Sequence, residues 1–144
     1  MSSLLSFDPG GTTGVALIEA TDDEVEVVWV KQIERGLQGF LDFHWDQLID
    51  MEFDKIVCES FNLREGIYGA DLTPVYIIGA LEALYPEKEI IYQEPKLKPL
   101  CDNDRLKKMN FYSPSKPHGM DAVRHGIIHL RNSKHMPTLE KGWR

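Results

Sequence analysis

Residues 3–19 read SLLSFDPGGTTGVALIE, two short apolar segments joined by a glycine-rich turn. The first segment, Ser3–Asp8, ends in an acid, and the second, Gly14–Glu19, is similarly apolar. Segments of this length on either side of glycines are typical of paired strands, so we predict a β-hairpin. The turn has two interpretations: a loop that cradles a phosphate, or a tight turn whose small residues let a substrate or metal approach the backbone.

The rest of the chain alternates between strand-like and helix-like patterns. After the hairpin, the hydrophobic spacing predicts a strand over Glu24–Gln32, a helix over 37–51, a strand over Asp54–Glu59, a helix over Leu72–Leu84, a strand over Lys88–Gln93 and a helix over 118–133. The proline- and lysine-rich stretch Glu94–Pro117 is predicted to be a surface connection with room for a short helix. The order βββαβαβ, then a loop and a helix, predicts an α/β fold in a single domain, residues 1–144.

The composition is that of an ordinary globular protein, with 42% hydrophobic and 27% charged residues. No apolar run approaches the ~20 residues of a membrane-spanning helix, so we expect no membrane partner. The N-terminus lacks a basic region and has an acid, Asp8, after seven residues, so we expect no signal peptide. Cys58 lies in an apolar run and Cys101 in a charged one, which favours reduced thiols and a cytoplasmic location. The sequence therefore argues against membrane, secreted and disulfide-rich classes.

Charge is divided unevenly along the chain. Residues 1–95 carry a net charge of −14 and residues 96–144 carry +7, so the overall −7 conceals a basic C-terminal third. Charge that is segregated along a chain often collects on one face of the fold. The basic third is therefore either a surface that binds nucleic acid or an ordinary solvated surface.

Two of the predicted strands end in acids, Asp8 and Glu59. If these strands are parallel neighbours, they lie roughly 4.8 Å apart and their carboxylates meet at one edge of the sheet. Two carboxylates held so close repel each other unless a cation lies between them, and their oxygens suit Mg²⁺ or Mn²⁺. Each acid also has a simpler explanation, because polar residues commonly end strands where the chain meets solvent.

The last predicted helix carries two polar side chains in its first turn. His118 and Asp121 are three residues apart and therefore project from one face. The apolar stripe of the same helix is predicted to pack on the sheet, which would bring both side chains toward the strand-terminal acids. Alternatively, Asp121 only complements the positive end of the helix dipole, and His118 only caps the helix.

Together these residues resemble the RuvC-type Holliday junction resolvases of the RNase H-like superfamily. The resemblance rests on three blocks, SFDPGGTTGVALI, IVCESF and HGMDAVRHGIIH. It implies a mixed five-stranded sheet of order 3-2-1-4-5 with helices on both faces, in a compact version like those of bacteriophages. It also implies a crossover junction endonuclease of DNA recombination. Its two Mg²⁺ or Mn²⁺ ions would be held by Asp8, Glu59, His118 and Asp121.

The resemblance assigns roles to residues outside these blocks as well. Basic residues after the fifth strand assist the reaction in that family, and Lys98 fits this catalytic role best, with Lys96 close behind. An aromatic residue after the catalytic Glu stacks on junction bases, which suggests Phe61, with Arg64 also probing opened bases. The expected phosphate contacts are Lys96, Lys98, Lys107, Lys108 and Arg124.

A homodimer is expected because symmetric nicking of a four-way junction needs two active sites at a fixed separation. The segment Leu72–Leu84 is apolar nearly all round and is predicted to be packed on several sides. It either forms the dimer interface or is buried within one subunit.

Two other functions compete with a resolvase that acts on branched DNA. YqgF-type nucleases, linked to ribosomal RNA processing, have a similar hairpin but a second acid after the fifth strand, where this chain has Glu94. The presence of Glu59 favours the resolvase. A non-catalytic junction-binding protein is the third hypothesis, and it has no need of four ligand residues. The connection 94–117 is shorter than in typical bacterial resolvases, where it contributes to the dimer and DNA-binding surfaces. The resemblance therefore defines the substrate less well than the nuclease chemistry.

Overall fold

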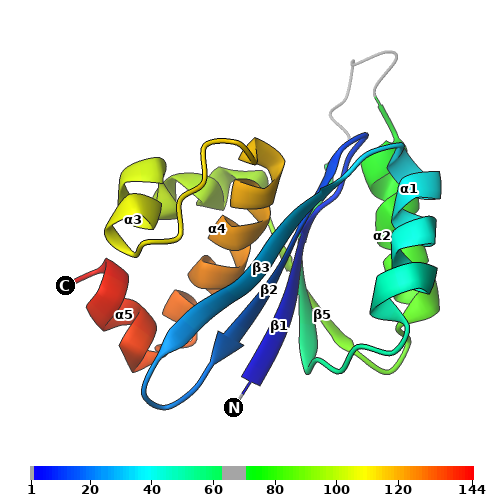
Figure 1. Cartoon of the computed structure of the whole chain (residues 1–144). Helices are drawn as coiled ribbons and strands as arrows, with labels where there is room; N and C mark the ends of the chain where they lie inside the picture. Colours follow the sequence, from blue (N-terminus) through cyan, green and yellow to red (C-terminus); the bar gives the residue numbers. More distant parts are fainter. Residues whose placement is uncertain (1, 63–70) are drawn as a thin grey trace.

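The computed structural model describes residues 2–62 and 71–144. Its centre is a mixed five-stranded sheet of order β3-β2-β1-β4-β5 (Figure 1). The strands are β1 (Ser2–Asp8), β2 (Thr13–Ala20), β3 (Val25–Ile33), β4 (Lys55–Glu59) and β5 (Glu89–Gln93). β2 pairs antiparallel with both β1 and β3, whereas β1, β4 and β5 run parallel. The predicted strand order is therefore confirmed.

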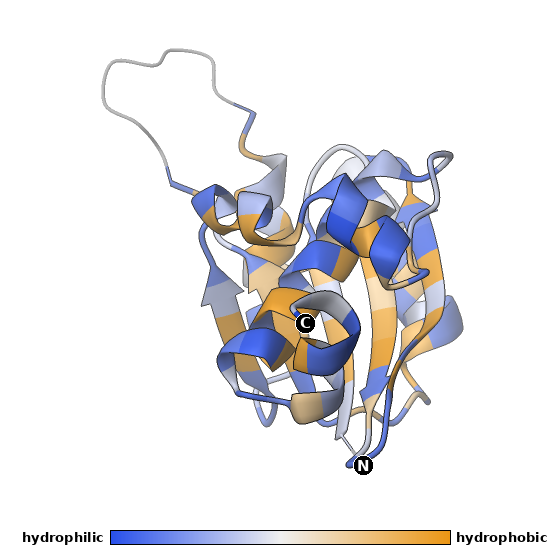
Figure 2. Ribbon diagram, turned by 90° about the vertical axis from the view of Figure 1, so that its left-hand side faces the viewer, coloured by the Kyte–Doolittle hydropathy of each residue, from blue (hydrophilic) through white to orange (hydrophobic). Residues whose placement is uncertain are grey.

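Helices cover both faces of the sheet, as the fold class predicts (Figure 1). One layer consists of α1 (Gly36–Phe43), the π-helical turn η1 (His44–Leu48) and α2 (Thr73–Leu84). The other layer consists of the 3₁₀ helix η2 (Pro95–Cys101), α3 (Asn103–Lys108), α4 (Pro117–Asn132) and α5 (Met136–Gly142). Figure 2 views the molecule from this second layer, with apolar residues along the strands behind the helices.

Side chains of the central strands alternate between the two layers. Leu5 and Phe7 of β1 belong to the core beneath α1 and α2, and Leu4 belongs to the core beneath α4. Because both faces of the sheet are covered, these strands are apolar on both sides, and their sequences read as nearly continuous apolar runs. No helix within residues 2–62 and 71–144 is long and apolar enough to cross a membrane.

Helix α4 lies close to the strands because small residues line the contact. A Cβ atom on Gly126 would stand 2.3 Å from Ile18 Cδ1 of β2, so the end of the Ile18 side chain would have to shift to admit it. The Ser6 hydroxyl of β1 donates a hydrogen bond of 2.6 Å to the Ala122 carbonyl oxygen. On β2, a Cβ atom at Gly14 would come within 1.9 Å of the His118 carbonyl oxygen. The last glycine of the hairpin turn therefore makes room for the first turn of α4.

The stretch 94–117 differs from its prediction as a surface connection. It contains η2 and α3, and Cys101, Leu106 and Met109 are fully buried in the core beneath α4. The sequence also shows no sign of α5. In residues 94–117 the apolar residues are sparse, and prolines interrupt their spacing. No local pattern therefore reveals that they are buried by contacts with other parts of the fold.

Helix α2 also differs from its prediction. Its buried residues are Ile77 and Leu81, whereas Leu72, Val75 and Tyr76 are 41%, 42% and 55% exposed. Of the two interpretations of this segment, burial within one subunit is therefore wrong: one side of α2 belongs to the core and the other faces outward. The remaining predicted helices and strands lie where the hydrophobic spacing places them, except that the first helical region ends at Leu48.

Candidate active site

The structure brings Asp8 and Glu59 together at one edge of the sheet. β1 and β4 are parallel, and Phe7 is paired with Cys58, so the next residue of each strand emerges beside the other. The two carboxyl side chains are 14% and 12% exposed. The acids therefore meet at the strand ends, as the predicted topology requires.

The pKa values of these two carboxyl groups are shifted in opposite directions. Burial raises the pKa of Asp8 to about 9, and the hydrogen bond with Glu59 and the charge of Glu59 act in the same direction. Burial also favours a higher pKa for Glu59, but hydrogen bonds from His125 and Asp8 and nearby positive charge outweigh it and hold the pKa at about 2. At neutral pH, protonated Asp8 donates to ionised Glu59. The proton relieves the repulsion that a cation would otherwise relieve.

A third carboxylate, Asp121, joins the pair from the first turns of α4. Lys98 of η2 lies between Asp121 and Glu59, with its Nζ 3.4 Å from Asp121 Oδ2 and 3.5 Å from Glu59 Oε1. Burial favours a lower pKa for Lys98, but the charges of the three carboxylates raise the pKa overall. The lysine is therefore an ammonium ion that bridges two carboxylates.

His118 lies at the solvent side of the cluster. Its Nδ1 is 3.9 Å from Asp8 Oδ2, and about half of its side chain is exposed. The backbone N–H groups of His118 and Gly119 donate to Gln32 Oε1 at 2.8 and 3.2 Å. Because the first N–H groups of a helix have no partner within the helix, Gln32 of β3 caps α4 and fixes its start. The imidazole thus stands on an anchored turn next to Asp8.

Sequence reasoning misses two residues of this site, His125 and Gln93. His125 lies four residues after Asp121 on α4 and is fully buried. Its Nε2 is 3.2 Å from Glu59 Oε2, and its Nδ1 is 2.8 Å from Gln93 Oε1. The sequence contains a feature that could have identified each of these residues. Gln93 is a polar residue that ends a strand, as Glu59 does, and His125 repeats the polar face of Asp121 one helical turn later.

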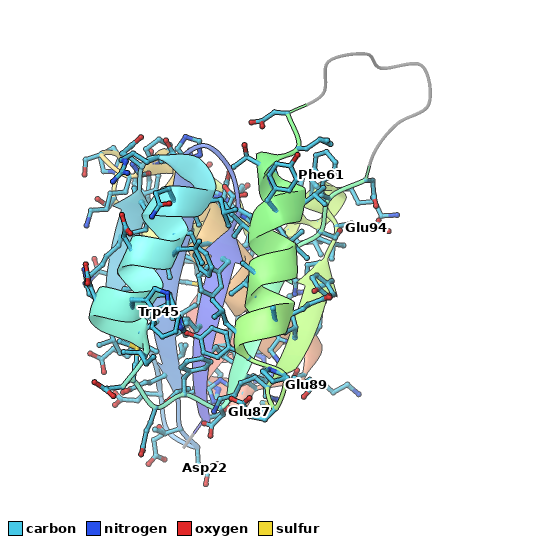
Figure 3. The ribbon with its side chains drawn as sticks, turned by 90° about the vertical axis from the view of Figure 1, so that its right-hand side faces the viewer. Asp22, Trp45, Phe61, Glu87, Glu89 and Glu94 are labelled. Atoms are coloured by element: carbon cyan, nitrogen blue, oxygen red, sulfur yellow. The ribbon has the colours of Figure 1, made fainter. Side chains whose placement is uncertain are left out.

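A cavity of about 390 Å³ opens beside the acids. Asp8 and Glu59 line it together with Phe61, the predicted base-stacking residue, which lies near the upper end of α2 in Figure 3. Lys96 and Glu94 also line the cavity, and their side chains form an ion pair of 2.8 Å. Glu94 therefore has Lys96 as its ion-pair partner, whereas Glu59 lies beside the acid Asp8 and contacts Lys98 and His125.

The lysines predicted to contact phosphate on α3 lie apart from the acids and are exposed. Lys107 Nζ stands 4.9 Å from the ring centre of Tyr112. Lys108 Nζ donates a hydrogen bond of 2.8 Å to the carbonyl oxygen of Arg144. Arg64, predicted to probe opened bases, lies outside the described residues.

Arg124 is placed differently from its prediction as a phosphate contact. Its side chain is 13% exposed, and its Nε is 3.3 Å from Asp121 Oδ1. The same guanidinium donates to Asn103 Oδ1 and, at 3.5 Å, to the Cys101 carbonyl oxygen. It therefore ties Asp121 to η2 and α3. The sequence predicts Arg124 as a phosphate contact because it lies in the basic C-terminal third. Its position along the chain does not show which side of α4 it occupies.

The donor set fits an oxygen-preferring divalent cation. Within residues 2–62 and 71–144, no three His, Cys, Asp or Glu side chains are already arranged as a metal-binding group. The raised pKa of Asp8 and the ammonium of Lys98 between Glu59 and Asp121 instead reduce the negative charge of the acids. Mg²⁺ and Mn²⁺ bind carboxylate oxygens, and either ion would take over this neutralisation.

Comparison by sequence finds no relatives: no protein-family profile matches the chain, and no curated protein does. Comparison by structure does find similar proteins. RuvC of T. thermophilus in complex with a Holliday junction substrate aligns with a TM-score of 0.72 and 11% identity, over 95% of this chain and 98% of that chain.

Two further structures give the same result. A structure of Thermus thermophilus RuvC aligns with a TM-score of 0.60 and 11% identity, over 92% of this chain and 95% of that chain. The Fowlpox virus resolvase in complex with Holliday junction DNA aligns with a TM-score of 0.62 and 12% identity, over 90% and 99%. The chain therefore has the fold of the RuvC-type resolvases, which the three sequence blocks predict.

Proposed function

We propose that this protein is a metal-dependent endonuclease that resolves Holliday junctions and other branched DNA by paired nicking. The observation that carries the proposal is the convergence of Asp8, Glu59 and Asp121 around Lys98 at the strand ends. The fold adds support, because two of the similar structures are resolvases in complex with Holliday junction DNA. By resemblance to the compact resolvases of bacteriophages, we also propose that the enzyme is phage-encoded and acts in the cytoplasm of the host cell.

In this proposal Asp8, Glu59, His118 and Asp121 hold two Mg²⁺ or Mn²⁺ ions, which supply activation of water and stabilisation of charge on the leaving 3′ oxygen. Asp8 would have to release its proton to solvent on binding of the cations. His118, exposed beside Asp8, would serve either as a further ligand or as the group that orients and deprotonates the attacking water. Lys98 keeps two of the carboxylates in place and offers its charge to the scissile phosphate. The product carries a 5′ phosphate.

The DNA is proposed to lie across the layer that contains α4. Residues 96–144, with a net charge of +7, form this layer, whereas α1 and α2 belong to the acidic part of the chain (Figure 1). Phosphate binding is largely electrostatic, so the two faces differ strongly in their attraction for DNA. The proposed phosphate contacts are Lys96, Lys98, Lys107 and Lys108. Phe61 and Arg64 are proposed to engage opened bases beside the acids.

Paired nicking requires a second active site, and we place the interface of a homodimer on the outer side of α2. Leu72, Val75 and Tyr76 are exposed there, and Trp45 of the same layer is 55% exposed (Figure 3). Large apolar side chains gathered on one side of a molecule mark an interaction surface. A two-fold axis through this side would use the same surface on both subunits.

The test is cleavage of a set of labelled substrates: a four-way junction, a flap, a linear duplex and a structured RNA. We expect the junction to be cut with Mg²⁺ or Mn²⁺ and spared with EDTA. Glu59→Gln should abolish cutting and Glu94→Gln should leave it intact. Cutting of RNA alone, lost with Glu94→Gln, would instead establish the RNA-processing alternative. Tight junction binding with no cutting would leave a binding protein.

A further inference from the structure

His125 occupies a position in α4 where packing alone would favour an apolar side chain. It is fully buried, and the neighbouring buried positions Ile127 and Ile128 are apolar. An imidazole in such surroundings needs partners for both of its nitrogens. It has them: Nε2 lies 3.2 Å from Glu59 Oε2, and Nδ1 lies 2.8 Å from Gln93 Oε1. The ring thus connects the end of β4 to the end of β5 through α4.

These contacts fix the carboxylate of Glu59 from the protein interior. One oxygen of Glu59 faces His125, and the other faces Lys98 at 3.5 Å. Lys98 is 30% exposed on a long side chain, whereas His125 is held in the middle of a helix that is packed on the sheet. Gln93, itself buried, holds the far side of the imidazole ring. His125 is therefore the partner that holds Glu59 from the protein interior, while Lys98 and Asp8 contact it from the side of the site.

We propose that His125, oriented by Gln93, is a positioning residue that fixes the Glu59 carboxylate for binding a divalent cation at the catalytic edge of the sheet. The inference rests on the proposed nuclease function and deepens it. Partners that orient a metal-binding carboxylate commonly contribute 10–100-fold to metal affinity or activity. A loss of this size is expected when the contact with Glu59 is broken.

Two substitutions separate this role from mere filling of the core. The amide of a glutamine reaches about as far as Nε2 of the imidazole, whereas that of an asparagine reaches about as far as Nδ1. His125→Gln therefore keeps a partner for Glu59, and His125→Asn keeps a partner for Gln93 only. Both variants place a smaller polar group in the same buried space, so their effects on melting temperature should be similar.

The measurements use the full chain freed of metal with a chelator. Mn²⁺ affinity is measured by calorimetry without DNA, junction affinity in EDTA, and junction cleavage under single-turnover conditions. We expect His125→Asn to weaken Mn²⁺ binding and slow cleavage about 10–100-fold, with unchanged junction affinity. We expect His125→Gln to lose less than about threefold in either quantity. In a Glu59→Gln chain, His125→Asn should weaken Mn²⁺ binding no further.

A matched control is His44, a buried histidine on the other layer whose Nδ1 is 2.7 Å from the Tyr85 hydroxyl. His44→Asn should lower the melting temperature and leave Mn²⁺ affinity unchanged. Equal Mn²⁺ affinity in His125→Asn and wild type overturns the inference. So do equal losses in both His125 variants that follow their melting temperatures. Mn²⁺ binding that depends on His125 in a chain that cuts no branched DNA refutes the proposed function and leaves the positioning role standing.

Discussion

Replacing Gly14 with alanine tests how the hairpin positions the first turn of α4. The new Cβ atom would lie 1.9 Å from the His118 carbonyl oxygen and 2.4 Å from the His118 carbonyl carbon. Real Cβ atoms approach no closer than 3.0 Å, so α4 and β2 must separate by about 1.1 Å. The obstacle is backbone, which no change of side-chain rotamer removes. The displacement carries His118 and Asp121 away from Asp8 and Glu59.

The substitution should lower both the stability of the protein and its rate of junction cleavage. Overpacking of this kind costs roughly 2–3 kcal/mol of unfolding free energy. At about 3 °C per kcal/mol for a chain of this length, the melting temperature falls by roughly 6–9 °C. A misplacement of about 1 Å at a catalytic site costs on the order of 100-fold in rate. We therefore expect Gly14→Ala to lose about 100-fold in junction cleavage and to melt earlier.

The assay is thermal denaturation together with single-turnover cleavage of a four-way junction. Gly11 provides the control, because it lies in the same turn, is exposed and has open space within 4 Å of the point where a Cβ atom would stand. Gly11→Ala should match the wild type in both measurements. If Gly14→Ala is as stable and as active as Gly11→Ala, the close approach of α4 to β2 does not hold the site together.

Three further predictions concern charge and assembly. The pKa of Asp8 is raised to about 9 from an ordinary value near 3.9. Between about pH 4 and pH 9 the folded metal-free protein therefore keeps a proton that the unfolded chain has already lost. Its stability should therefore fall as pH rises through this window, and Asp8→Asn should remove that part of the slope in denaturation experiments in EDTA; identical slopes would contradict the raised pKa of Asp8. Lys107→Glu combined with Lys108→Glu should weaken junction binding and reduce its dependence on log salt concentration by about 0.9 for each phosphate that is no longer neutralised. Lys31→Glu, on β3 with its ammonium beside Phe43 of α1, should leave both unchanged, and equal effects would move the DNA off the α4 layer. Tyr76→Asp, at a side chain that is 55% exposed on α2, should convert a dimer to a monomer in sedimentation equilibrium, and a wild-type monomer would exclude this interface.

The sequence predicts the parts of the fold that depend on local pattern. The hairpin follows from two apolar segments around glycines, and the acids at strand ends follow from the position of Asp8 and Glu59 within their apolar runs. The placement of β4 beside β1 follows from the family resemblance, and the structure confirms it. Because strand spacing is nearly constant, this neighbour relation is enough to bring the two carboxyl groups together.

Other parts depend on contacts that no local pattern shows. Cys101, Leu106 and Met109 are too sparse in the sequence to predict a packed layer, and they are buried where η2, α3, α4 and α5 pack together. Arg124 and His125 are adjacent in sequence, yet one ties Asp121 to η2 and the other reaches Glu59. The sequence places both on α4, but the direction of each side chain depends on how the helix is rotated against the sheet.

The most direct test of the proposed nuclease is the cleavage of an end-labelled four-way junction by the wild type and by Asp8→Asn in Mg²⁺. We predict paired, symmetric nicks by the wild type that vanish with EDTA and with Asp8→Asn, while the variant still binds the junction. Cleavage by Asp8→Asn at the wild-type rate, or a wild type that binds the junction tightly and leaves it intact in Mg²⁺ and Mn²⁺, would contradict a metal-dependent resolvase centred on Asp8.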